Sequence, residues 1–148
     1  MATYYADNHG VGDQPNTGIG VHVAYGEYDL TAAQVSTSHE FLLCKLPKGA
    51  TLLDVTVGAT DLDTNGSPTV TFDVGLSVNP DQVRFANALT LGQGGGVAQT
   101  TRQVMDDGGI GFYVLPTEDW LKIKFDGAAA TAAAGTLKAT VEYTMAQK

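Results

Sequence analysis

The sequence predicts an all-β protein, a single antiparallel β-sandwich that is jelly-roll-like, with an extended N-terminal arm. Three observations support this fold class. Several segments alternate apolar and polar residues with a period of two, as half-buried strands do. Glycine is abundant, with 18 residues, and glycine-rich clusters separate these segments as turns would. The length of 148 residues suits one domain with a hydrophobic core of its own.

Residues 1–20 are predicted to form the arm, and residues 21–148 the sandwich domain. The first segment contains turn-forming clusters such as Asn8-His9-Gly10 and has neither helical nor alternating periodicity. It nevertheless carries apolar groups that a solvated tail has no reason to carry. We expect these groups to contact an adjacent protein, and the alternative is that the arm packs on its own sandwich. The predicted contact residues are Tyr4, Tyr5, Val11, Ile19 and Val21.

The clearest strand lies at the C-terminus, over residues 136–145. Its apolar members alternate with threonine, lysine and glutamate, so one face is buried and the other is polar. The same pattern predicts strands over residues 69–76 and 120–125. Phe72 and Val141 are expected on inward faces, and the apolar residues of the C-terminal strand are Leu137, Ala139, Val141, Tyr143 and Met145.

Residues 40–46 and 51–59 are apolar on nearly both faces, which is typical of central strands. Pro47-Lys48-Gly49 separates them and predicts a tight turn. The alanine-rich segment 128–134 is bracketed by glycines and is too short for a stable helix, so we expect a hairpin loop between the last two strands, with a single helical turn as the alternative. Weaker strands are expected at residues 21–28, 97–104 and 110–115.

The charge balance argues against two classes of partner. Eight Lys and Arg residues stand against 16 Asp and Glu residues, which gives a net charge of −8. Such a chain has no basic stripe for phosphates, so we expect it to bind neither nucleic acid nor anionic membranes. Cys44 is the one cysteine and is expected to be a small buried hydrophobe. The first residues do not form a signal peptide and no apolar run reaches membrane-span length, so the protein is expected to be made in a cytoplasm.

One acidic loop invites a metal interpretation. Asp61, Asp63 and Asn65 alternate before Gly66, as in the first half of a calcium-binding EF-hand loop. The twelfth position of that loop would be Phe72, where an EF-hand places a bidentate glutamate. Asn-Gly is itself a strong turn signal, so the sequence favours a hairpin turn and no metal or other cofactor.

No residue pattern predicts catalysis. The Gly92–Gly96 run lacks the Lys-Ser/Thr that completes a phosphate-binding loop. The histidines, at positions 9, 22 and 39, have no metal spacing, and the adjacent acids lie in loops. We therefore predict no catalytic residues and no enzyme activity.

The most distinctive stretch is Leu46-Pro47-Lys48-Gly49-Ala50-Thr51-Leu52-Leu53-Asp54-Val55. Together with the loop at 61–66, the strand at 69–75 and the ending at 134–143, it resembles small virion proteins of tailed bacteriophages. The resemblance covers roughly residues 20–145 and rests on turn and strand patterns.

The resemblance implies a capsid decoration (cementing) protein on the outside of the head shell. Proteins of this type are β-rich, are often homotrimers and bind the major capsid protein without a catalytic site. Two other classes stay open. One is a carbohydrate- or receptor-binding β-sandwich in a head fibre or tail component, for which Trp120 and Tyr113 are the candidate aromatics. The other, an enzyme, is the least favoured.

Overall fold

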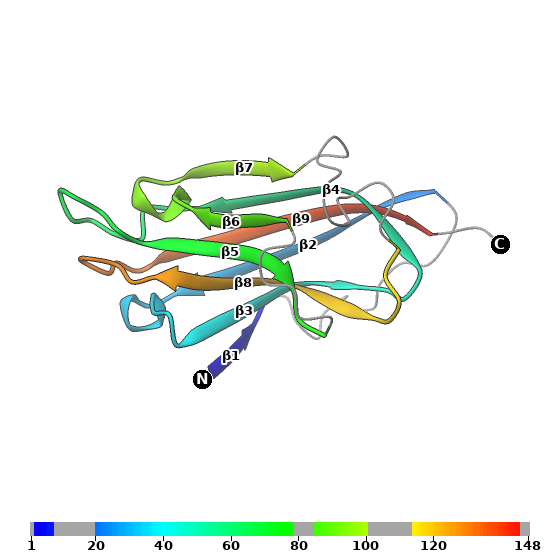
Figure 1. Ribbon diagram of the computed structural model, residues 1–148, viewed down its shortest axis with the longest axis horizontal. Coiled ribbons are helices and arrows are strands. Elements are labelled where there is room, and N and C mark those ends of the chain that lie inside the picture. Colours follow the sequence, from blue (N-terminus) through cyan, green and yellow to red (C-terminus); the bar gives the residue numbers. More distant parts are fainter. Residues whose placement is uncertain (1, 8–19, 79–84, 101–113, 146–148) are drawn as a thin grey trace.

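The computed structural model describes residues 2–7, 20–78, 85–100 and 114–145. Two β-sheets pack face to face, and the predicted all-β sandwich is confirmed (Figure 1). One sheet has the strand order β2-β9-β4-β7, and the other has the order β1-β3-β8-β5-β6. The strands are β1 (Ala2–Tyr5), β2 (Val21–Leu30), β3 (His39–Leu46), β4 (Ala50–Ala59), β5 (Thr71–Leu76), β6 (Ala86–Leu89), β7 (Gly96–Thr100), β8 (Asp119–Gly127) and β9 (Gly135–Met145).

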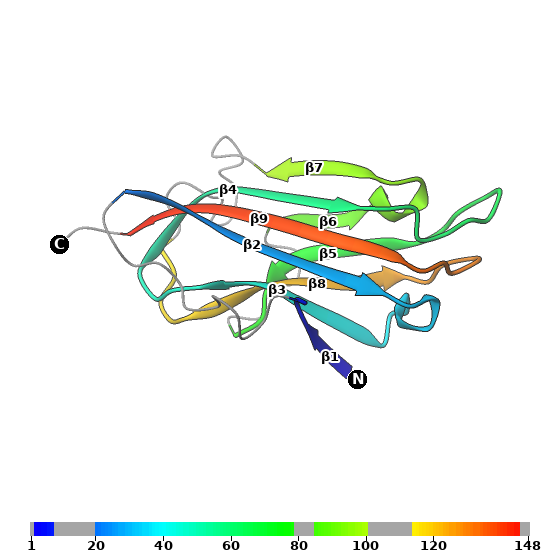
Figure 2. The ribbon, with the colours of Figure 1, turned by 180° about the vertical axis from the view of Figure 1, so that it is seen from behind.

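From β2 onward the chain passes from one sheet to the other at nearly every connection. Among the strands that the structure describes, only β5 and β6 are consecutive and pair within one sheet, and all pairings except that of β1 with β3 are antiparallel. This alternation places β2, β9, β4 and β7 behind β3, β8, β5 and β6 in Figure 1 and in front of them in Figure 2. The arrangement is compatible with two interlocked Greek keys, as in an eight-stranded jelly roll.

The core lies between the sheets and follows the predicted alternation. Phe72 on β5 and Val141 on β9 are fully buried, so both predicted inward positions are confirmed. Phe72 and Phe41 both meet the ring of Phe125 edge to face, at centroid distances of 6.0 and 5.8 Å. Cys44 is also fully buried, as predicted, and burial raises the pKa of its thiol to about 12.

Two of the predicted turns have a different role from the one expected. Residues 47–49 join β3 to β4, and residues 128–134 join β8 to β9, but each pair of strands lies in different sheets. The segments are therefore sheet-to-sheet crossings and not hairpins. The alanine-rich segment is a loop without a helical turn. The period-two pattern tells which side of a strand is buried, but it does not tell which sheet the strand joins.

The weaker strands and the N-terminus also differ in detail. The strand expected at 21–28 extends to Leu30, and β7 covers the start of the segment expected at 97–104. Of the segment 110–115 only residues 114 and 115 are described, and Val114 forms an isolated bridge with Thr51. Residues 2–5, assigned to the arm from the sequence, form β1 and pair in parallel with β3. No helix in the described part of the chain could span a membrane.

A glycine permits the closest approach between the two sheets. Gly26 on β2 is buried, and a Cβ placed on it would lie 1.8 Å from the backbone oxygen of Leu43 on β3. Neither backbone can yield without disturbing its own sheet, because Gly26 is paired with Ala139 of β9 and β3 is paired with β8. Glycine is therefore the residue that fits at position 26 of β2.

We expect Gly26→Ala to lower the free energy of unfolding by about 1–3 kcal/mol or more, because the added methyl group overpacks a backbone contact. Gly66→Ala is the matched control, since a Cβ there meets nothing within 4 Å, and it should change stability by less than about 0.5 kcal/mol. Urea denaturation of both variants measures the difference. Equal stabilities would contradict the close approach of β2 and β3.

Candidate functional site

The first predicted contact residue, Tyr4, packs against the protein's own core. Its ring stacks on Phe41 at a centroid distance of 5.2 Å and meets Tyr28 and His39 at 5.6 and 5.3 Å. Tyr4 is half-buried in this aromatic cluster. It holds β1 in place and is engaged within the domain.

Residues 6 and 7 extend this attachment across the side of the sandwich. The backbone N–H of Ala6 donates to the Leu42 carbonyl of β3 at 2.9 Å, and that of Asp7 donates to the Glu27 carbonyl of β2 at 2.6 Å. The Asp7 carboxylate then accepts a hydrogen bond from the Asp29 backbone at 3.0 Å. Since β2 and β3 belong to different sheets, residues 2–7 close the open side between their edges.

The other predicted contact residues fall in different places. Tyr5 is 44% exposed and meets Trp120 edge to face at 5.3 Å, so Trp120 packs against β1. Val21 opens β2 and is 62% exposed. Val11 and Ile19 lie outside the described residues, as does Tyr113. Of the predicted contact residues that the structure describes, Tyr4, Tyr5 and Val21 do not form one cluster.

Sequence reasoning missed the rest of the exposed stripe on β2. Val23 and Tyr25 lie on the same outer face as Val21 and are 61% and 47% exposed. The signal was available, because alternate residues of 21–25 are apolar and β-branched or aromatic on a face that the fold leaves uncovered. Next to this stripe, the outer face of β9 and β4 is rich in threonine, with Thr51, Thr56, Thr136, Thr140 and Thr144.

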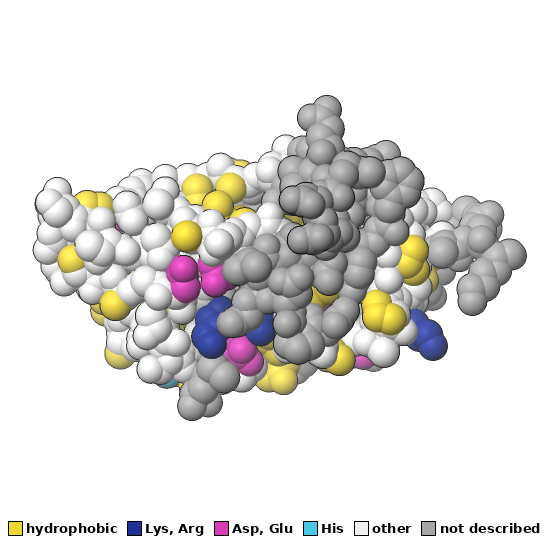
Figure 3. Space-filling view, in the orientation of Figure 1, with side chains coloured by type: hydrophobic (Ala, Val, Ile, Leu, Met, Phe, Trp, Pro, Cys, Tyr) yellow, Lys and Arg dark blue, Asp and Glu magenta, His cyan; other side chains and the backbone are white. Residues whose placement is uncertain are grey.

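The outer face of the second sheet carries paired charges. The Lys122 ammonium on β8 lies 3.7 Å from the Glu40 carboxylate on β3, and both side chains are largely buried. Burial raises the pKa of Asp73 on β5, although the Ala88 backbone N–H donates to its carboxylate and opposes the shift. Basic and acidic side chains lie together near the middle of this face in Figure 3. Lys122 and Glu40 thus neutralise each other within the sheet, and Asp73 is held by a backbone donor.

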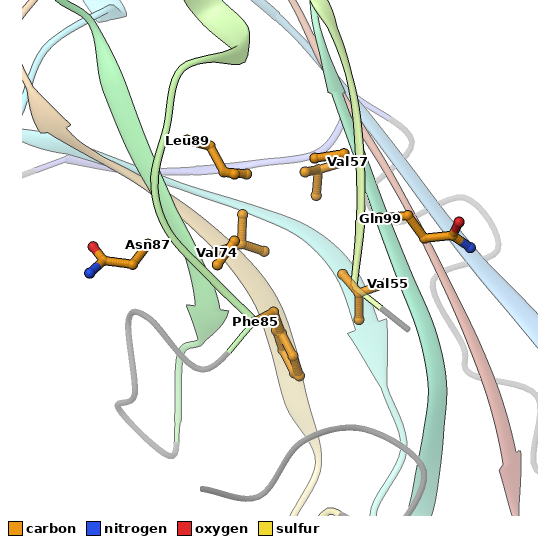
Figure 4. Close-up of a pocket in the computed structure, with 9 residues that line it drawn as sticks. Val55, Val57, Val74, Phe85, Asn87, Leu89 and Gln99 are labelled. Atoms are coloured by element: carbon orange, nitrogen blue, oxygen red, sulfur yellow. The ribbon is translucent and has the colours of Figure 1, made fainter. Parts of the chain in front are cut away.

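A small apolar cavity of about 270 Å³ opens between the sheets at the β6 and β7 side. Val55, Val57, Val74 and Leu89 surround it, while the polar ends of Asn87 and Gln99 lie at its margin (Figure 4). None of the described residues that line it is titratable. The cavity offers apolar contact and no acid–base chemistry.

The acidic loop predicted to be a turn contains a buried carboxylate that joins three segments. Asp63 is only 1% exposed. Its Oδ2 accepts backbone hydrogen bonds from Thr69 and Ala130 at 2.8 Å and from Val70 at 3.2 Å, and its Oδ1 accepts one from Thr131 at 2.8 Å. Residues 69 and 70 lead into β5, and residues 130 and 131 lie in the crossing from β8 to β9.

The same hydrogen bonds argue against a cation at this loop. Both oxygens of Asp63 already accept N–H groups, and the side chains of Asp61 and Asn65 accept N–H groups of residues two positions ahead. Among the described residues no group of three or more His, Cys, Asp or Glu side chains could hold a metal ion. The loop is therefore organised by backbone donors of its own and of the crossing from β8 to β9. It leads from β4 in one sheet to β5 in the other, so the expected hairpin turn is wrong and the segment is a further crossing between the sheets.

No protein-family model and no curated protein matches this chain. Several solved structures do match it. A chain of the capsid asymmetric unit of cyanophage Pam1 is 31% identical, with a TM-score of 0.72, over 89% of this chain and 91% of that chain.

Two further capsids contain chains with the same fold. A chain of the capsid of Ralstonia phage GP4 is 24% identical, with a TM-score of 0.77, over 99% of this chain and 100% of that one. A chain of the acid-stable capsid of Helicobacter pylori bacteriophage KHP30 is 13% identical, with a TM-score of 0.53, over 88% and 90%. At these identities the two likenesses concern the fold.

We expect Asp63→Asn to lower the melting temperature by several degrees, because an amide offers one oxygen where the carboxylate offers two charged acceptors. Asp61→Asn is the control, since the exposed Asp61 side chain accepts only the Asp63 N–H at 3.1 Å. Thermal unfolding at neutral pH compares the two. A larger loss in the control would contradict the central role of Asp63.

The same contact predicts a dependence on pH. Burial by itself raises the pKa of Asp63. The hydrogen bonds from the N–H groups of Thr69, Thr131, Ala130 and Val70 lower it by more, so the pKa lies well below its usual range. The carboxylate therefore stabilises the fold fully above the pKa of the unfolded chain, about 3.9, and loses this effect as the pH falls toward the folded value. The difference in melting temperature between the wild type and Asp63→Asn should shrink below about pH 4.

Proposed function

This chain belongs to the same family as a chain of the cyanophage Pam1 capsid, and we propose that it is a virion decoration (cementing) protein bound to the outside of a phage head shell. The observation that carries the proposal is the 31% identity over nine-tenths of both chains, on a shared fold. Its partner in this proposal is the major capsid protein. A non-catalytic role is part of the proposal.

The electrostatics support an exterior position. A chain with a net charge of −8 would be repelled by packaged DNA if it lined the interior of the shell. On the outside, acidic side chains keep a protein soluble and favour contact with basic partner surfaces. Nothing in an exterior role requires a cofactor.

The N-terminal segment supports assembly with further copies. Tyr4 anchors β1 on the domain, and Tyr5 and Val21 remain exposed on either side of residues 8–19. We propose that this segment, with Val11 and Ile19, contacts an adjacent copy or the shell. Exposed aromatic and β-branched side chains are the kind that anchor such contacts.

The experiment adds the purified chain to head shells that lack it. We expect saturable binding, because a decoration protein joins a shell that is already assembled. Cryo-electron microscopy of the saturated particles then locates the added density. Absence of binding, or density on the inner surface, would contradict the proposed role.

We also propose a homotrimer in solution: closed symmetry buries the exposed residues of all copies equally, and the resemblance to phage decoration proteins favours three copies. Sedimentation equilibrium at micromolar concentration should give three times the chain mass of 15.4 kDa. Tyr5→Ser should shift the equilibrium toward monomer, whereas Val97→Ser, on the far edge of the other sheet, should not. A wild-type protein that sediments as a monomer would count against the trimer.

A further inference from the structure

The start of β2 and the end of β9 lie at the same end of the sheet (Figure 2). By the strand register, two rows of outward-facing side chains cross this end. The first row runs from Val21 through Thr144 and Thr51 to Val114, according to the strand register and the bridge of Thr51 with Val114. The outer valines are 62% and 44% exposed. This row is neutral, with an apolar group at each end.

The second row contains Val23, Glu142 and Asp54 as successive cross-strand partners. Two carboxylates thus lie directly opposite each other on β9 and β4, and both are half-buried. Like charges in this position destabilise a sheet. Among the described residues neither carboxylate accepts a hydrogen bond or forms an ion pair.

The nearby lysines that the structure describes do not neutralise this pair. Lys138, the cation of β9, lies 3.7 Å from Glu27 farther along the same face. Lys48 is exposed in the turn before β4 and makes no ion pair with either carboxylate. The fold therefore retains a repulsive acidic pair, bordered by exposed valines, on a face that the described residues leave open.

We propose that this surface, formed by Val21, Val23, Asp54, Val114 and Glu142, docks onto a basic and partly apolar segment of the major capsid protein. The proposal rests on the proposed function and adds which face binds and what chemistry it recognises. A Lys or Arg side chain entering between the valines would convert the repulsion into attraction, and an Arg fork can contact both carboxylates. A second copy of this chain fits less well, because it carries twice as many acidic as basic residues.

The test uses the double variant Asp54→Asn/Glu142→Gln in the shell-binding assay. We expect its affinity to fall about tenfold at low salt and its salt dependence to weaken, because interfacial charge pairs are lost. Its melting temperature should equal or exceed that of the wild type, since a like-charge pair has been removed. The control, Glu118→Gln/Asp126→Asn, removes the same number of charges from the other sheet and should bind as the wild type does.

The apolar half of the surface has its own variant. Val23→Thr should weaken shell binding about fivefold, while Val97→Thr, at the opposite edge of the same sheet, should not. Wild-type binding with an unchanged double variant would overturn this inference and leave the proposed function intact. Failure of the wild type to bind would overturn the proposed function itself. A double variant that dissociates into monomers with unchanged shell affinity would assign the surface to a second copy and overturn the proposal.

Discussion

The arrangement of the sandwich depends on one buried carboxylate. Asp63 stands in the crossing from β4 to β5 and binds N–H groups in the crossing from β8 to β9, so a single side chain joins two connections that are far apart in sequence. Loops that pass between sheets leave backbone donors without strand partners, and buried donors must be satisfied. Asp63 accepts hydrogen bonds from five backbone N–H groups of these two crossings at one point. A charged acceptor is stronger than a neutral one here, which offsets the cost of burying it.

A second constraint applies along the side of the domain where β2 and β3, which belong to different sheets, lie next to each other. There Gly26 allows β2 to lie against the backbone of β3, and residues 2–7 bond to both strands. This closure covers part of the β3 edge and part of the β2 edge. Covered edges limit uncontrolled pairing between copies, so contacts must be made through side chains on the faces. The valines and tyrosine of β2 are the side chains that this closure leaves exposed.

The surface charges divide between the two sheets in a way that suits a protein bound on one face. On the β3-β8-β5 side, Lys122 and Glu40 pair within the sheet. On the β9-β4 side, Asp54 and Glu142 lie opposite each other, and no described cation forms an ion pair with either of them. A domain optimised for stability alone would not keep that pair, and proteins commonly accept such local costs where they bind partners. The fold is shared with other phage capsid chains, whereas binding depends on such surface details.

The sequence by itself determined the all-β class, the inward residues such as Phe72 and Val141 and the burial of Cys44, because a period of two and an apolar run are local properties. Only the tertiary structure decided that residues 47–49 and 128–134 are crossings between the sheets and that Tyr4 packs against its own domain, because strand pairing joins residues far apart in sequence. The same holds for Asp63 and for the opposition of Asp54 and Glu142. In the sequence these are isolated acids, and their meaning arises only when register places donors or another carboxylate beside them.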